Sequence, residues 1–227
     1  MISGQAQAVE PRPLPRGPHS LAREQVLASQ RGRMIDGIAS AVAEKGYAAT
    51  TVGDVVKAAG VSRKTFYEHF TDKEECFMAA WETGVQLLFD AIYASQRDAA
   101  NPLERMRLGL RAYLQTLASE PDFARAFLIE VVAAGPEAEA RRGQVHDRFC
   151  ELFVTQHADA RLERPDLPIV PRQVCRAAVG AVNELVSDYV RDGRTAELPE
   201  LEDTILYLEL VLFAGHEAAA AATRRRA

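Results

Sequence analysis

The sequence predicts an all-α protein of about nine helices joined by short loops. Apolar residues recur at helical spacing along most of the 227 residues, and no segment alternates with a period of two for long enough to form a strand. Five prolines stand at positions typical of a first helical turn, where a missing N–H costs nothing: Pro102, Pro121, Pro136, Pro171 and Pro199.

The composition is that of an ordinary globular chain, with 48% hydrophobic and 26% charged residues. Because no apolar run approaches the roughly 20 residues that span a bilayer, we expect no membrane helix. The first 20 residues lack the apolar region of a secretory signal, so we expect a cytoplasmic protein. Cys76, Cys150 and Cys175 lie far apart, which predicts buried free thiols and no metal site or other cofactor.

Charge is distributed unevenly along the chain, whose formal net charge is −5. Residues 1–75 carry ten Lys/Arg and nine Asp/Glu, a net of +1, and the remaining residues have a net of −6. A weakly basic head on an acidic body is compatible with local binding of nucleic acid by the head.

Residues 1–22 are expected to form a disordered arm, because their first 20 residues hold four prolines, two glycines and few apolar residues. Arg12 and Arg16 belong to this arm, and Arg23 directly follows it. Arginine arms enter an adjacent minor groove in some DNA-binding proteins, and an unstructured tail is the alternative interpretation.

Residues 23–72 are predicted to hold three helices. The first runs from about Arg23 and ends at Gly46, since glycine readily adopts the left-handed conformation past a helix end. Its apolar stripe consists of Leu27, Met34, Ile38, Ala41 and Val42.

Two short helices follow, each with its own start and stop signal. Thr51 and Asp54 form a capping-box pattern that opens one helix near Val52, and Gly60 ends it. Ser62 can cap the next one. A second capping-box pattern, Thr71 with Glu74, predicts a long helix from about Asp72 into the nineties.

Two short helices joined through a glycine turn form a helix-turn-helix unit, whose second helix enters the major groove of DNA. On that second helix the helical period places Val61, Phe66 and Phe70 inward. The residues left outward suit contacts with base edges and phosphates, and they are Arg63, Lys64, Thr65, Tyr67 and His69. Thr51, at the start of the preceding helix, is a further candidate for a phosphate contact.

These segments closely resemble the TetR family of bacterial repressors. The resemblance covers about residues 25–80 and rests on the segments 44–52, 59–62 and 65–74. It implies an Ω-shaped homodimer in which each subunit has a three-helix DNA-binding head and a larger helical body. It also implies that Lys73, at the start of the fourth helix, touches a phosphate group.

Residues 73–227 are expected to form the body, which binds an effector and dimerises. An effector cavity is mostly apolar with a few polar groups, so aromatic residues of the body and polar residues within apolar stretches are the candidates. The candidate lining residues are Trp81, Phe89, Tyr93, Tyr113, Phe127, Glu130, His146, Phe149 and Asn183. Such a lining favours a hydrophobic or aromatic effector, and ordinary core packing is the alternative role for each residue.

The last two helices carry apolar residues on two faces, which indicates one partner inside the subunit and one outside. A four-helix bundle across a two-fold axis satisfies this pattern, and a core within one subunit is the alternative. The candidate interface residues are Val174, Ala178, Val182, Leu185, Ile205, Leu208 and Leu212.

The sequence therefore predicts a homodimeric repressor that is released from a palindromic operator in double-stranded DNA by an unidentified small molecule. No G-x-S-x-G, Walker A, H-E-x-x-H or G-x-G-x-x-G motif is present, so we expect no enzymatic activity. Two alternatives remain: a ligand- or lipid-binding helical protein of the same fold that does not bind DNA, and an activator or ligand-requiring repressor.

Overall fold

The computed structural model describes residues 23–223, which form ten α-helices, two 3₁₀ helices and no strand. The predicted arm 1–22 and the basic tail Arg224–Arg226 lie outside these residues. In chain order the elements are α1 (Arg23–Lys45), α2 (Val52–Ala59), α3 (Arg63–His69), α4 (Lys73–Ser95), α5 (Pro102–Ser119), α6 (Pro121–Leu128), η1 (Glu130–Ala134), α7 (Pro136–Glu163), α8 (Arg172–Arg191), η2 (Thr195–Leu201), α9 (Glu202–Ala214) and α10 (His216–Thr223). The all-α prediction is confirmed.

The helix-turn-helix has the caps that the sequence predicted. Thr51 accepts a hydrogen bond from the Asp54 amide, and the Asp54 carboxylate accepts one from the Thr51 amide at 2.8 Å. Gly60 ends α2 in the left-handed conformation, with φ at 62°. The Ser62 hydroxyl caps α3 by accepting from the Thr65 amide at 3.0 Å. Local hydrogen bonding alone therefore specifies both ends of α2 and the start of α3.

Three boundary predictions were wrong in detail. Asp72, one residue after the predicted cap, begins α4 by accepting from the Glu75 amide, and Glu75 rather than Glu74 accepts from the Thr71 amide. Pro199 lies inside η2 instead of opening an α-helix. Gly215, with φ at 90°, separates α9 from α10, so the terminal segment holds two α-helices.

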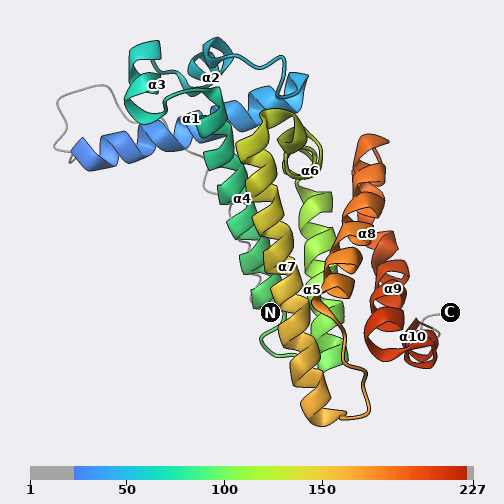
Figure 1. The fold of residues 1–227 in the computed structure, drawn as a ribbon. Helices are drawn as coiled ribbons and strands as arrows, with labels where there is room; N and C mark the ends of the chain where they lie inside the picture. The colour runs from blue at the N-terminus through green and yellow to red at the C-terminus, as the bar shows by residue number, and fades with distance from the viewer. Residues whose placement is uncertain (1–22, 224–227) are drawn as a thin grey trace, which may run out of the picture.

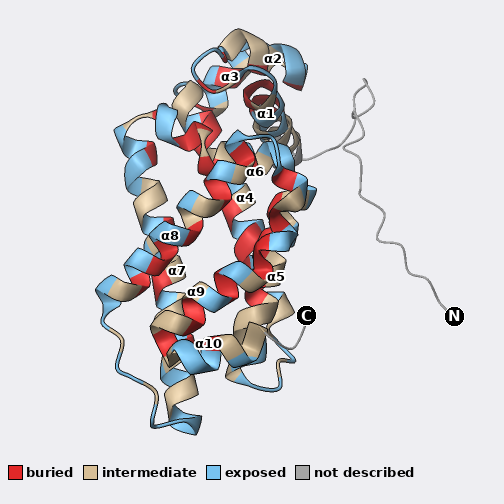
Figure 2. Cartoon of the chain, turned by 90° about the vertical axis from the view of Figure 1, so that its right-hand side faces the viewer, coloured by how far each residue is buried: buried red, intermediate tan, exposed pale blue. Residues whose placement is uncertain are grey.

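The molecule consists of a small head set on one end of a longer helical body (Figure 1). Helices α1 to α3 form the head, and α4 leaves it and runs down into the body beside α7. Helices α8 and α9 lie along one side of the body, and red buried positions face its interior (Figure 2). One apolar cluster continues from Met34 and Phe66 in the head to Leu206 in the body. The predicted boundary at residue 73 thus coincides with the start of α4, but the core does not stop there.

The described residues contain neither a disulfide nor a cluster of metal-binding side chains. The three cysteines are buried and free, as predicted. Within residues 23–223, no three His, Cys, Asp or Glu side chains gather as a metal-binding group. No helix of that range is both long enough and apolar enough to cross a membrane.

Helices α1 and α2 cross at a glycine that sequence analysis did not single out. A Cβ atom added at Gly37 lies 3.1 Å from the Val55 carbonyl oxygen and 3.2 Å from the Ala59 amide nitrogen. Both neighbours are backbone atoms, so neither can move aside by changing rotamer. The close crossing of α1 over α2 therefore requires glycine at this position.

Gly37→Ala is expected to destabilise the protein by about 1–3 kcal/mol, because the added methyl group forces α1 and α2 apart. Gly32→Ala on the same helix is the matched control, since nothing lies within 4 Å of its added Cβ. The control should be neutral or more stable by up to about 1 kcal/mol through the better helix propensity of alanine. Chemical denaturation measures both, and equal stabilities of the two variants would refute the close crossing.

Candidate functional site

Helix α3 presents a basic and polar surface away from the head. Arg63, Lys64 and Tyr67 are exposed, and the Tyr67 side chain has 56% of its area accessible. On the opposite side, Phe66 is fully buried and packs on the Phe70 ring at a centroid distance of 5.7 Å. The helix is therefore anchored by its phenylalanines, while three donor-bearing side chains are free to reach a ligand outside.

The other three candidates on the helix-turn-helix are already engaged within the head. Both donors of Thr51, its amide and its hydroxyl, bind the Asp54 carboxylate, at 2.8 and 2.6 Å. Lys45 pairs with the same carboxylate, and this bond and those of Thr51 hold the pKa of Asp54 well below its usual value. Thr65 and His69 are half-buried, with side-chain contacts to Ser62 at 3.0 Å and Gln30 at 3.4 Å. Thr51 is thus a helix cap rather than a free phosphate donor.

Lys73 lies at the first turn of α4 and holds the loop between α1 and α2. Its Nζ donates to the Tyr47 carbonyl oxygen at 2.9 Å and stands 4.1 Å from the centroid of the Tyr47 ring. An ammonium has three N–H donors, so this bond leaves others for an external acceptor. The Tyr47 ring also packs on Phe77 of α4 at 4.8 Å.

Glu130 joins the head to the body. Its carboxylate accepts a buried hydrogen bond from the Tyr47 amide at 2.8 Å and pairs with Arg125 at 2.9 Å. Glu130 is the first residue of η1, directly after α6. Its assignment to an effector cavity was wrong, because both carboxylate oxygens are used at this joint.

The body contains a partly open cavity of about 70 Å³ among α4, α5, α6, α7, α8 and α9. Its lining is mostly apolar and includes Met106, Leu110 and Val179, which sequence analysis had not singled out. Five of the nine predicted lining residues lie there, namely Tyr113, Phe127, His146, Phe149 and Asn183. Burial lowers the pKa of His146, which also shares a side-chain hydrogen bond with Asn183.

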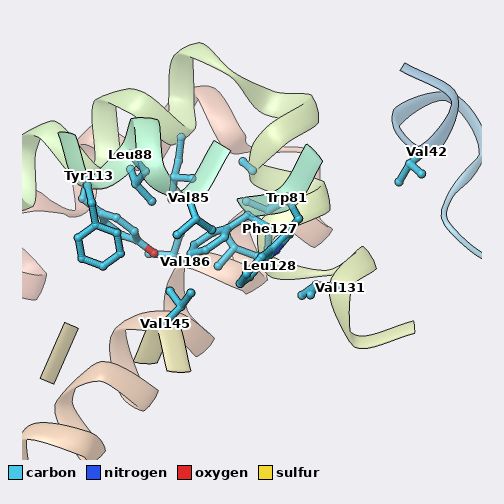
Figure 3. Packing of buried hydrophobic residues seen from close by; sticks show 14 of the residues in the cluster. Val42, Trp81, Val85, Leu88, Tyr113, Phe127, Leu128, Val131, Val145 and Val186 are labelled. Atoms are coloured by element: carbon cyan, nitrogen blue, oxygen red, sulfur yellow. Dashed lines mark hydrogen bonds between the residues drawn. The ribbon is translucent and has the colours of Figure 1, made fainter. Parts of the chain in front are cut away.

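The three remaining aromatic candidates do not line this cavity. Trp81 lies behind it, stacked on Phe127 with ring centroids 5.8 Å apart, and Figure 3 shows this pair beside Leu128 and Val186. Phe89 is fully buried, and its ring lies under the Arg148 guanidinium. Tyr93 is 42% exposed on the outside of α4. All three residues lie on α4, and helical spacing alone did not distinguish the side that faces the cavity from the other sides of this helix.

Three polar residues that sequence analysis missed line the cavity: Glu209 of α9, Gln156 of α7 and Gln96, which follows α4. Glu209 is 2% exposed, and among the described residues neither its Oε2 nor Gln156 Nε2 has a hydrogen-bond partner. Burial raises the pKa of Glu209 to about 8, so its carboxyl group is largely protonated at neutral pH. Glu209 could have been found from the sequence, because it is the single acidic residue of the apolar segment 204–215. The same criterion had selected Glu130.

Three predicted interface residues were wrong. Ala178 and Ile205 are fully buried within the subunit, and Val182 lines the cavity, so these side chains offer no surface to a partner. Val174, Leu185, Leu208 and Leu212 stay partly exposed. The outward face of α9 carries Tyr207, which is 36% exposed, and that of α8 carries Ala177, Gly180 and Ala181.

Residues 35–80 match the family model described as bacterial regulatory proteins of the tetR family. The match covers the C-terminal part of α1, all of α2 and α3, and the first turns of α4. It therefore contains every residue discussed above on the outward face of α3, together with Tyr47 and Lys73.

Relatives and solved structures extend the similarity over the body. The HTH-type transcriptional repressor KstR2 of Mycobacterium tuberculosis is 28% identical, with 64% of this chain and 87% of KstR2 covered. The fatty acid degradation regulator FadR of Bacillus halodurans superposes with a TM-score of 0.71 at 20% identity, covering 80% of this chain and 94% of that one. FadR of Bacillus subtilis, solved in complex with stearoyl-CoA, has a TM-score of 0.71 at 19% identity, covering 81% and 98%.

The buried carboxyl group of Glu209 predicts a specific pH dependence of stability. The folded state keeps a proton that the unfolded state releases above the ordinary pKa near 4.5, so wild-type stability falls as pH rises from there to about 8. Glu209→Gln removes this titration, while Tyr113 and His146, the other titratable groups of the lining, remain in both proteins.

The stability difference between Glu209→Gln and wild type should therefore grow with pH by up to about 1.4 kcal/mol per unit across this range. Urea denaturation at several pH values from 4.5 to 8 measures it. Parallel stability curves for the two proteins would contradict the protonated carboxyl group.

Proposed function

The chain belongs to the TetR family of bacterial regulatory proteins, and we propose from this that it is a cytoplasmic transcriptional repressor, not an enzyme, that responds to a small apolar effector. The observation that carries the proposal is the surface of α3. It exposes Arg63, Lys64 and Tyr67 on a helix whose Phe66 is fully buried. A ligand-binding protein without a DNA partner has no use for such a surface.

Helix α3 enters the major groove of operator DNA. Arg63 and Lys64 donate to guanine edges or to phosphates, and Tyr67 donates to a phosphate oxygen. Lys73 adds a phosphate contact beside the α1–α2 loop that it holds. Thr65 and His69 are half-buried at the border of this surface, and their accessible parts add contacts at the edge of the DNA interface.

A homodimer presents two such helices to a palindromic site, with recognition helices roughly 34–36 Å apart. The subunits meet through the outward faces of α8 and α9. Tyr207 and Leu208 supply the apolar contact on α9, and the small residues Ala177 and Ala181 on α8 let the helices approach closely. In this proposed interface, the exposed residues of α8 and α9 take the place of Ala178, Val182 and Ile205, which the sequence had suggested and which face inward.

The effector occupies the cavity of the body. KstR2 is named a repressor, and FadR of Bacillus subtilis was solved with stearoyl-CoA, so a ligand with a long apolar chain in a regulator of this fold has a precedent. The cavity of about 70 Å³ is far smaller than the roughly 300–1,000 Å³ of typical ligand sites. An effector must therefore enlarge it by displacing lining side chains and the helices that carry them.

Displacement of Phe127 transmits the change to the head. Phe127 lies on α6, three residues before Glu130, and Glu130 binds the Tyr47 amide in the head. Phe123 of the same helix packs tightly on α4 at Gly84, where an added Cβ atom would lie 2.3 Å from its ring. Movement of α6 thus shifts both α4 and the α1–α2 loop, and it changes the spacing of the two heads.

Arg63→Ala and Lys64→Ala test the DNA contacts. Each should weaken operator binding by about 1–3 kcal/mol if the side chain reads a base, or lower the salt dependence by about one counterion if it binds a phosphate. Arg97→Ala is the control, because it removes the same charge from an exposed position at the far end of α4.

In vitro selection of bound duplexes supplies the operator for these measurements, and a two-fold palindrome is expected. The assignment of α3 is refuted if both variants bind as wild type does, and the repressor proposal is refuted if no duplex is retained at low salt.

A ligand-free double-mutant cycle tests the transmission through Glu130. Phe127→Trp overfills the cavity on the α6 side and should weaken operator binding by about 1–3 kcal/mol. In a Glu130→Ala background the same substitution should have a much smaller effect, since the link to Tyr47 is missing. Phe153→Trp adds the same bulk from α7 and serves as the control. Equal effects of Phe127→Trp in both backgrounds would exclude Glu130 from the path.

A further inference from the structure

We propose that the effector is a neutral, mainly apolar molecule whose carbonyl oxygen accepts hydrogen bonds from Glu209 and Gln156, and that the cavity rejects carboxylates and ammonium ions of the same shape. This inference rests on the proposed function, because it assigns the ligand class of the same cavity. It is carried by two polar atoms without a hydrogen-bond partner among the described residues, in a lining that is mostly apolar.

The two atoms need an acceptor. Gln156 Nε2 belongs to an amide, whose N–H groups only donate. The Glu209 carboxyl group also donates when it is protonated, and its Oε2 has no partner among the described residues. Leaving such a donor buried without a partner is unfavourable, so a ligand oxygen that accepts from both removes two existing costs.

The surroundings disfavour an ionic ligand. Among the side chains of residues 23–223 that line the cavity, none is Lys, Arg or Asp, and Glu209 is the only carboxyl group. His146 is the one lining residue with a basic nitrogen, and burial lowers its pKa, which favours the neutral imidazole. A ligand carboxylate would therefore meet no fixed cation in a mostly apolar site, where an unpaired charge is costly. An ammonium ion would face the amide donor of Gln156, and it would require Glu209 to ionise in a setting that favours its neutral form.

The apolar part of the ligand has aromatic neighbours. Phe149 and Phe153 of α7 line the cavity together with Phe127 of α6. The single tryptophan of the chain, Trp81, stacks on Phe127, so its fluorescence reports occupancy of the cavity without a label. A probe with one aromatic ring and one carbonyl group is the smallest molecule that uses both parts of the lining.

Four probes of nearly the same shape test the ligand class. They are benzylacetone, the amine that replaces its carbonyl group, the carboxylate hydrocinnamate, and butylbenzene, which has no polar atom. Binding is followed by Trp81 fluorescence and calorimetry on the full-length chain. Benzylacetone is expected to bind about tenfold more tightly than each of the others, the change that one neutral hydrogen bond of about 1.4 kcal/mol produces.

Three variants assign the effect to its residues. Glu209→Leu should remove the tenfold preference for benzylacetone and leave butylbenzene binding unchanged or tighter. Glu209→Gln should retain most of the preference, because its amide still donates. Asp203→Asn makes the same change from carboxyl to amide on the same helix but outside the cavity lining, and it should bind as wild type does.

Tightest binding by the amine or by hydrocinnamate would overturn the inference, as would an unchanged order of affinities in Glu209→Leu. Failure of all four probes to bind would overturn it as well. Operator binding is measured in parallel on wild type. Its loss would count against the proposed repressor but not against the order of probe affinities, so the two failures are distinguishable.

Discussion

The rest of the structure depends on one apolar core that passes without interruption from the head into the body. Helix α4 carries it, with Cys76 and Phe77 buried in its first turns and Leu88 and Ile92 buried further along. Because protein interiors are close-packed, a head on such a core cannot turn freely on its body. The Tyr47–Glu130 hydrogen bond adds a directional polar contact to this packing. Ligand-dependent control of DNA binding therefore does not require a hinge between head and body. A second packing arrangement of α6 against α4 is sufficient.

The cavity is where the sequence departs from the rules that stabilise a core. Glu209 lies among four buried apolar residues of the same helix, Ile205, Leu206, Leu210 and Phe213. Replacing it by a hydrophobic residue should stabilise the ligand-free protein, because an unpartnered buried polar group costs about 1–3 kcal/mol. A residue whose type lowers the stability of the fold is often found at a functional position, because a property other than stability is needed there. Glu209 is such a position, and Gln156 is a second one in the same lining.

The parts of the molecule that the sequence predicted are those set by local chemistry. Caps such as Thr51 and Ser62 act within three residues of themselves, so their pattern is visible in the chain. Helix α9 carries apolar residues on more than one face, and periodicity does not say which side turns inward, so Ile205 was predicted at the surface although it is fully buried, while Tyr207 is exposed. Glu130 is separated from Tyr47 by 83 residues, and no spacing rule connects them. Tertiary partners, not propensity, decided each of these cases.

In the proposed mechanism, occupancy of the body cavity is transmitted to the DNA-binding head through the Tyr47–Glu130 bond. Hydrogen–deuterium exchange at the Tyr47 amide tests it most directly, because this N–H is the donor of the bond. In the operator complex the amide should exchange slowly, and a cavity ligand that releases the operator should accelerate its exchange. Release of the operator with no change in exchange at Tyr47 would contradict the account.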